Sequence, residues 1–339
     1  MNVQRWIARR EQSWRSLDAL LKQAEKKGIK SLKSDQVRQM ASLYRSVSAD
    51  LARATSHQVS PAVIKDLRGL TTRGYSQIYQ GSRRQEWQAL KDFYAYGFPE
   101  VVQQSWVYIA VATLLFAVGG AIGWWFAWRD DSFMTLVLGS GFVESVRESQ
   151  ELWTVSILGE EPVASSGIMI NNIAVSLYAI IGGVTTYQPA IPLITPPGAF
   201  TVYLLVFNGL MIGCVSALVA QVNLAYDLWA FVFPHGSLEL PAIFFAGGAG
   251  LLIARGILIP GQYRRIDALK IYGLQAAKLV YGIIPMLFIA GIIEGFFSPQ
   301  LWIPNEVKYF FGTVLFIILV QYCRRKRPFL LNEATHSLR

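Results

Sequence analysis

The chain has 339 residues, of which 53% are hydrophobic and only 16% are charged, and its mean hydropathy is +0.35. This composition excludes an ordinary soluble globular protein and predicts an integral membrane protein. The charge is uneven, because residues 1–103 contain 18 lysines and arginines against 9 acidic residues, a net +9, whereas the rest contains 13 of each.

The first 103 residues are predicted to form a basic, cytoplasmic helical domain. Apolar residues recur at helical spacing from Trp6 to Leu21, and Gly28 is a typical residue to end such a run. Ser34 caps a second run, and Ser60 followed by Pro61 opens a third. The stretch "EWQALKDFYAYGF" suggests a fourth helix. The domain lacks the apolar stretch of about 7–15 residues of a signal peptide, so none is expected.

Six candidate transmembrane helices follow, each near the ~20 residues needed to cross a hydrocarbon core. Their predicted ranges are 104–128, 168–187, 200–220, 241–259, 279–297 and 307–323. We therefore predict an all-α fold, a polytopic α-helical membrane protein with a transmembrane domain over 104–323 and a basic tail over 324–339.

The charges of the connecting loops predict the orientation. The long 129–167 loop has two basic and seven acidic residues, whereas the 260–278 loop has four basic residues and one acidic one, and the tail begins "RRKR". Basic loops stay on the cytoplasmic side of the membrane. We therefore expect both termini in the cytoplasm, the 129–167 loop outside, and a location in the bacterial inner membrane. Within that loop, "GFVESVRESQELWTVSILG" suggests a helix on the outer surface.

A few polar residues lie within or next to the predicted spans, and each needs an explanation because lipid offers no hydrogen bonds. They form a predicted intramembrane cluster: Asn171, Asn172, Asn208, His235 and Glu239. Arg255 and Glu294 lie near the ends of their spans, from which such side chains can extend to water.

His235 and Glu239 are the most distinctive pair in this group. Pro234 suits the first turn of a helix, and the separation of four residues places the imidazole and the carboxylate on one helix face. Two ligands are too few to define a metal site, so the sequence alone does not decide whether this pair contributes to one. The pair either ties the entrance of the fourth span to a neighbouring helix or lines a functional cavity. We expect it to form one polar cluster with the asparagines.

Small residues predict which helices pack closely. Four of them recur every fourth position in the fourth span and predict a central helix in contact with another backbone: Ala242, Ala246, Gly250 and Ala254. The G-x-x-x-G spacing occurs in three other spans, at 119/123, 209/213 and 291/295.

Three motifs in order resemble the stage II sporulation protein M family of bacterial membrane proteins. They are "MINNIAVSLYAIIGG" at 169–183, "VFNGLMIG" at 206–213 and "FPHGSLELPAIFFAGGAGL" at 233–251. The resemblance covers about 150–300 and implies a multi-pass inner-membrane protein that anchors peptidoglycan-degrading partners. It implies no chemistry for the polar residues of the motifs.

Three classes of function remain from the sequence. The chain is expected to be a scaffold for cell-envelope remodelling partners; the alternative is a transporter or channel with a polar site around His235 and Glu239. An enzyme is not expected, because the sequence has no H-E-x-x-H motif, no serine–histidine pair and no phosphate-binding glycine loop.

Cys214 and Cys323 carry no functional signal, and no cofactor is expected. Expected partners are the lipid bilayer, peptidoglycan-remodelling enzymes or other membrane proteins, and a second copy in a homo-oligomer; nucleic acid is not expected.

Overall fold

The computed structural model describes residues 3–57, 59–80, 83–154, 161–184, 186–188 and 193–328. The chain divides into two compact units, Met1–Phe93 and Tyr94–Arg339. The division lies before the change of composition near residue 103, because α5 (Phe98–Gln104) packs against α12 (Arg265–Phe296) and α13 (Asn305–Cys323) of the second unit.

The first unit contains three main helices, α1 (Val3–Lys27), α2 (Ser34–Ser56) and α3 (Pro61–Tyr75). A short 3-10 turn, η1 (Ile29–Ser31), joins α1 to α2, and the π-helical turns η2 (Ser76–Gln80) and η3 (Phe93–Gly97) flank α4 (Arg83–Asp92). The apolar faces of the three main helices meet in one core: Leu17, Leu20, Leu21, Ala24, Leu32, Met40, Val47, Ala54, Val59 and Leu67. This unit therefore buries a core of its own.

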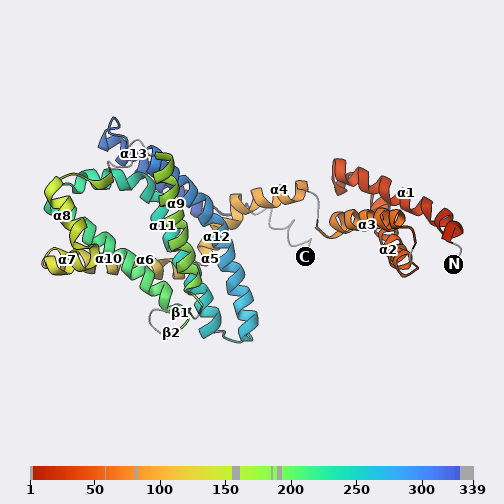
Figure 1. The fold of residues 1–339 in the computed structure, drawn as a ribbon, viewed down its shortest axis with the longest axis horizontal. Coiled ribbons are helices and arrows are strands. Elements are labelled where there is room, and N and C mark those ends of the chain that lie inside the picture. The colour runs from red at the N-terminus through yellow and green to blue at the C-terminus, as the bar shows by residue number, and fades with distance from the viewer. Residues whose placement is uncertain are drawn as a thin grey trace. The chain divides into compact units, whose positions relative to one another are not determined.

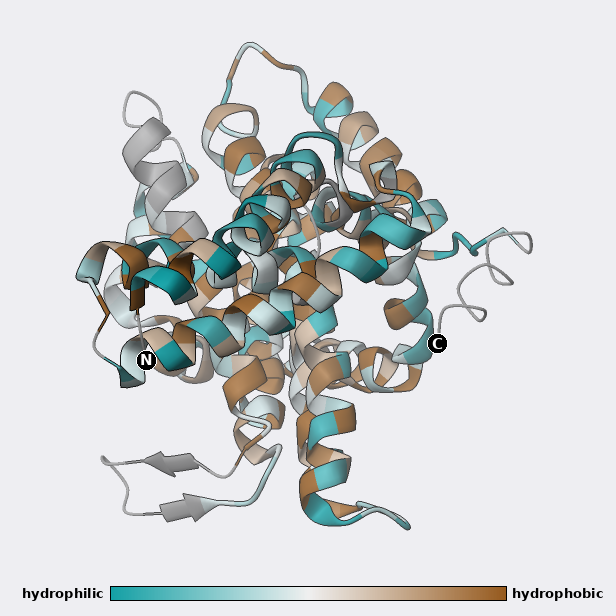
Figure 2. Ribbon diagram, turned by 90° about the vertical axis from the view of Figure 1, so that its right-hand side faces the viewer, coloured by the Kyte–Doolittle hydropathy of each residue, from teal (hydrophilic) through white to brown (hydrophobic). Residues whose placement is uncertain are grey.

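The second unit contains five helices that are long and apolar enough to cross a membrane: α6 (Trp106–Ala127), α10 (Ala199–Gln221), α11 (Ala225–Leu258), α12 and α13. They correspond to five of the six predicted spans and confirm the all-α polytopic class (Figure 1). Many of their large apolar side chains are exposed, as lipid-facing residues must be. Figure 2 colours the ribbon by hydropathy, with hydrophobic residues in brown.

The second predicted span, 168–187, differs from the prediction. It corresponds to α9 (Glu161–Ile181), which ends before residue 187, the predicted end of the span. The helix ends before two glycines, which favour helix termination, and a short antiparallel pair follows, β1 (Thr186–Gln188) and β2 (Leu193–Thr195). Among the described residues, five helices reach the length and hydropathy of a full span, and the described apolar part of α9 is Ile170–Ile181.

Helices α6 and α10 pack with their backbones in contact. A Cβ atom added at Gly119 or Gly123 of α6 would collide with the carbonyl oxygen of a residue in α10, and one added at Gly209 or Gly213 of α10 would collide with a carbonyl oxygen of α6. The two G-x-x-x-G motifs therefore face each other. Because glycine has no side chain, the two backbones can approach closely at these positions.

Helix α11 is the most buried of the five long helices. In its most apolar stretch 61% of residues are buried, against 22% in α6, and it contacts α6, α9, α10, α12 and α13. Its 34 residues extend about 51 Å, well beyond the ~30 Å of hydrocarbon. The helices are longer than the predicted spans 241–259 and 279–297: α11 begins at Ala225, and α12 already begins at Arg265, within the predicted 260–278 loop.

The first part of the predicted outer loop 129–167 is a helical hairpin. Helices α7 (Asp131–Leu138) and α8 (Ser140–Ser149) are joined at Gly139, whose φ of 87° is a left-handed conformation that favours glycine. Apolar residues of both helices are buried against the ends of α6 and α10: Met134, Val143 and Val146 pack with Ala127, Cys214, Ala217 and Leu218. The hairpin is thus fixed to the bundle. Residues 155–160 lie outside the described residues.

Candidate functional site

His235 and Glu239 lie in the interior of α11 rather than at the start of a span. The helix continues through Pro234 and Pro241, although each proline lacks the N–H that would bond to the carbonyl four residues earlier. The prolines therefore leave the carbonyl oxygens of Ala230 and Ser237 without their usual helical donors. The Ser237 hydroxyl donates to the carbonyl oxygen of Pro234 at 2.9 Å. The prediction that Pro234 opens the helix was therefore wrong, whereas the spacing of four residues does place both side chains on one helix face.

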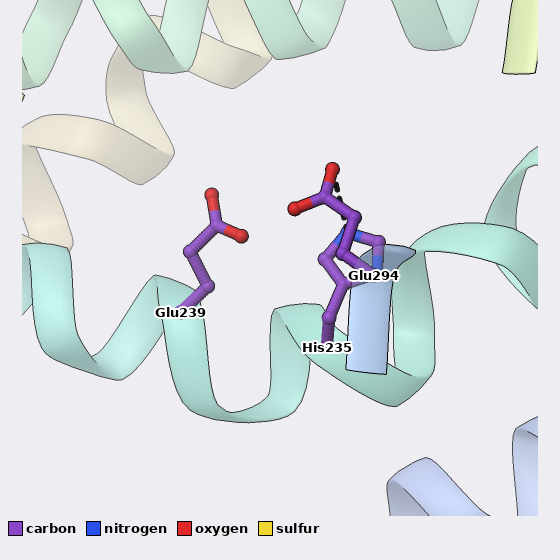
Figure 3. A group of neighbouring side chains, drawn as sticks. All are labelled: His235, Glu239 and Glu294. Atoms are coloured by element: carbon purple, nitrogen blue, oxygen red, sulfur yellow. Dashed lines mark ion pairs between the residues drawn. The ribbon is translucent and has the colours of Figure 1, made fainter. Parts of the chain in front are cut away.

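Glu294 of α12 completes the site (Figure 3). Its Oε1 atom is 3.8 Å from Nε2 of His235, and the two side chains are only 12% and 6% exposed. One ligand atom from each of His235, Glu239 and Glu294 lies within 4.8 Å of the others. The prediction that Glu294 extends to water from the end of its span was wrong, because α11 covers this end of α12.

Two further residues hold the histidine ring. Nδ1 of His235 is hydrogen-bonded to the hydroxyl of Ser298 at 3.0 Å, in the turn after α12. The ammonium group of Lys308 in α13 donates to the carbonyl oxygen of Ser298 at 2.8 Å, and Lys308 is buried. The imidazole is therefore oriented with Nδ1 towards Ser298 and Nε2 towards Glu294.

The asparagines do not join this cluster. Asn208 donates to the carbonyl oxygen of Leu204 in its own helix at 2.8 Å, and the amide of Asn171 is 3.4 Å from the side-chain oxygen of Asn172. The expected hydrogen bonds from the asparagines to His235 and Glu239 are absent from the described contacts. Glu294 and Ser298 are the residues that lie beside His235, where the asparagines were predicted.

The four small residues of α11 are all buried: Ala242, Ala246, Gly250 and Ala254. A Cβ atom at Gly250 would collide with the carbonyl oxygen of Ala179 in α9, so the two backbones touch there. Arg255, near the end of α11, is exposed and donates to the hydroxyl of Tyr272 at 2.9 Å.

The two carboxyl groups of the site are incompletely satisfied. Oε2 of Glu239 and Oε2 of Glu294 are both buried and make no hydrogen bond within the described part of the chain. A buried charge without a partner is costly, so these oxygens call for a proton or a cation. Chemically, the arrangement can hold a proton between acidic groups or supply three ligands, one nitrogen and two oxygens, to a metal ion.

A cavity of about 390 Å³ lies next to the site. Ser298 and Lys308 belong to its lining, together with Phe231 and Asp227 of α11 and residues 150–152 and 154 that follow α8. The cavity therefore connects the segment that orients His235 with the surface formed by the α7–α8 region.

Two residues of this site, His235 and Glu239, were predicted from the sequence. Glu294 was recognised as an acidic residue in an apolar span, but its position near the span end suggested contact with water. Ser298 and Lys308 gave no usable signal, because neither lies in a motif and their importance arises only from contacts between helices.

Comparison with known families gives two matches. The family model described as stage II sporulation protein M matches residues 112–299, which include His235, Glu239, Glu294 and Ser298. A model of a domain of unknown function matches residues 4–80, most of the first unit. Neither the curated proteins nor the solved structures contain a significant match to the chain.

Proposed function

Because the chain belongs to the stage II sporulation protein M family, we propose that it is a scaffold of the bacterial inner membrane that holds peptidoglycan-remodelling partners. Both termini lie in the cytoplasm under this proposal, and the α7–α8 side faces the cell wall, as the distribution of basic loops predicts. The proposal includes no catalytic step, because the sequence contains none of the enzyme motifs considered above.

The observation that supports a scaffold is the rigid surface on the predicted outer side. We call it the outer platform, and it consists of α7, α8, residues 150–154 and the turn 297–304. Arg147 of α8 donates to Asp131 at 2.7 Å and to the side-chain oxygen of Gln221 in α10 at 3.0 Å, so polar contacts add to the buried apolar contacts of the hairpin. A surface fixed in this way can bind a partner without the loss of conformational entropy that ordering a loop would cause.

The outer platform also exposes large apolar side chains outside the five long helices. Leu136 is 82% exposed, Leu301 is 73% exposed and Trp302 is 79% exposed. Exposed apolar residues next to polar ones are typical of protein-binding surfaces. Partners of the platform would be proteins with an extracytoplasmic peptidoglycan-remodelling domain.

Site-specific photo-crosslinking in native membranes tests this proposal. A photoreactive amino acid at Leu136 or Leu301 should crosslink a peptidoglycan-remodelling protein, whereas the same amino acid at Leu114 of α6, 62% exposed on a membrane-spanning helix, should not. Crosslinks to lipid alone at all three positions, or equal capture of the same protein at Leu114, would contradict the scaffold.

The buried carboxyl groups favour one alternative, a transporter of protons or small cations. Buried ionisable residues inside a membrane protein commonly mark an ion path. Purified chain in proteoliposomes should then carry a cation or proton flux that Glu294→Gln abolishes. A flux equal to that of protein-free vesicles would leave the scaffold as the better proposal.

A further inference from the structure

We propose that His235, Glu239 and Glu294 bind a divalent transition-metal ion, zinc or manganese, between α11 and α12. The inference goes beyond the scaffold function and does not depend on the identity of any partner. It rests on the convergence of three ligand atoms within 4.8 Å of one another from two different helices.

The charge of the two carboxyl groups favours a cation. Two carboxyl groups share a site from which the protein excludes most water, and one oxygen of each, Oε2 of Glu239 and Oε2 of Glu294, has no hydrogen-bond partner among the described residues. Two carboxylates near each other repel strongly in a medium of low dielectric constant. A divalent cation with a neutral imidazole would cancel both negative charges and provide the missing partner for the oxygens.

The orientation of the His235 ring also suits a metal ligand. A histidine that binds a metal through one ring nitrogen usually has its other nitrogen fixed by a hydrogen bond. Nδ1 of His235 is fixed in this way by Ser298, whose carbonyl oxygen is in turn held by Lys308. Nε2 is consequently directed into the space that it shares with the carboxylates, 3.8 Å from Glu294.

The spacing of the ligand atoms also suits a metal ion. One ligand atom from each of His235, Glu239 and Glu294 lies within 4.8 Å of the others. Ligand atoms of a tetrahedral zinc ion, with bonds of about 2.0–2.1 Å, are about 3.4 Å apart. Side-chain rotations that move each carboxylate by about an ångström would suffice to bind the ion.

The donor set decides the class of metal. Imidazole nitrogen favours zinc, iron, nickel and copper, and carboxylate oxygen favours manganese, magnesium and calcium. One nitrogen with two carboxylates therefore favours zinc or manganese over magnesium and calcium. Three protein ligands leave at least one position for water. The neighbouring cavity reaches Ser298, which holds Nδ1 of His235, although the three ligands themselves do not line it.

Metal analysis of the full-length chain in detergent tests the proposal. The purified protein is stripped with a chelator, equilibrated with Zn²⁺, Mn²⁺ or Ca²⁺, freed of unbound ion and analysed by mass spectrometry. We expect about one zinc or manganese ion per chain, no calcium, and a higher melting temperature with the bound metal. His235→Asn, Glu239→Gln and Glu294→Gln should each lose both the ion and the rise in melting temperature.

Matched controls are available within the same chain. His57→Asn and Glu144→Gln remove an exposed histidine and an exposed glutamate and should keep the metal of the parent chain. Parent protein that retains no more metal than Glu294→Gln, with both proteins helical and monodisperse, would overturn the proposal. An infrared band of a protonated carboxyl group in the parent protein that Glu294→Gln removes would identify a shared proton and would equally overturn it.

X-ray absorption of the zinc-loaded parent protein keeps the proposal falsifiable if the variants do not fold. A first coordination shell with one imidazole nitrogen and carboxylate oxygens supports the site. A shell without imidazole places the ion elsewhere on the protein and overturns the assignment.

Discussion

Replacing Gly209 in α10 with alanine should destabilise the membrane unit, whereas the same change at Gly273 in α12 should have little effect. A Cβ atom at Gly209 would collide with the carbonyl oxygen of Phe116 and lie 3.0 Å from the backbone nitrogen of Gly120, so no side-chain rotation can relieve the contact. At Gly273 nothing lies within 4 Å of the added atom.

The size of the effect follows from the packing of α6 against α10. Overpacking of a close contact costs about 1–3 kcal/mol. In soluble proteins alanine would regain about 0.5–1 kcal/mol of helix propensity. Membrane helices remain helical before they associate, so little of this gain is expected here. A loss near 2 kcal/mol corresponds to about a 30-fold shift of the folding equilibrium, using about 1.4 kcal/mol per factor of ten.

Unfolding in mixed micelles of increasing SDS content, followed by circular dichroism and tryptophan fluorescence, measures both variants against the parent chain. We expect the midpoint of Gly209→Ala to fall clearly and that of Gly273→Ala to stay close to the parent value. Equal midpoints for the two variants would refute the inference that α6 and α10 are held in backbone contact.

Three further predictions concern the orientation and the first unit. Cysteine at Ser145 of α8 should react with a membrane-impermeant reagent added from outside, and reaction only from the cytoplasmic side would reverse the topology. The basic first unit should co-sediment with vesicles containing anionic lipid, and salt should weaken this binding because the Debye length is only about 8–10 Å; equal binding to neutral vesicles would contradict it. Hydrogen bonds from Lys22 and Arg73 lower the pKa of Asp18 below its ordinary 3.8. Because the pKa of Asp18 is lower in the folded state, its ionised carboxylate stabilises the fold above pH 3.8. This stabilisation is lost as the pH falls through the lower pKa of the folded state. The melting temperatures of residues 1–93 and of their Asp18→Asn variant should therefore converge in acid, and a constant difference would contradict this assignment.

The helices could be predicted from the sequence because their signals are local. Apolar length identified five of the spans, and periodic apolar residues identified the helices of the first unit. Gly28 does follow the end of α1, but the N-cap of α2 is Lys33 and not Ser34, which is the first residue of the helix. The start of α11 was missed because Pro234 usually marks a first turn. In a membrane helix, neighbouring helices, hydroxyl side chains or water can satisfy the backbone groups that a proline frees, and α11 continues through Pro234.

The candidate site was only partly predictable because its partners are distant in sequence. The spacing of four residues between His235 and Glu239 predicts a shared face without any knowledge of tertiary structure. Which residue meets that face depends on how α12 packs against α11, and no local pattern reports this. The asparagines were reasonable partners by chemistry, but their amides bond within their own helices or with each other.

Glu294 shows why the position of a residue within its own helix is a poor guide to its environment. It lies two residues before the end of α12, yet its side chain is only 12% exposed, because α11 begins far outside the predicted span and covers this end of α12. The same overlap brings the turn after α12 against α11, where Ser298 fixes His235 and also lines the cavity beside the outer platform. A partner that displaced this turn would therefore also move the hydrogen bond that directs Nε2 of His235. We therefore expect Ser298 to couple the binding of a partner at the outer platform to the positions of His235, Glu239 and Glu294. By thermodynamic linkage, a change in this cluster would in turn alter the affinity for the partner.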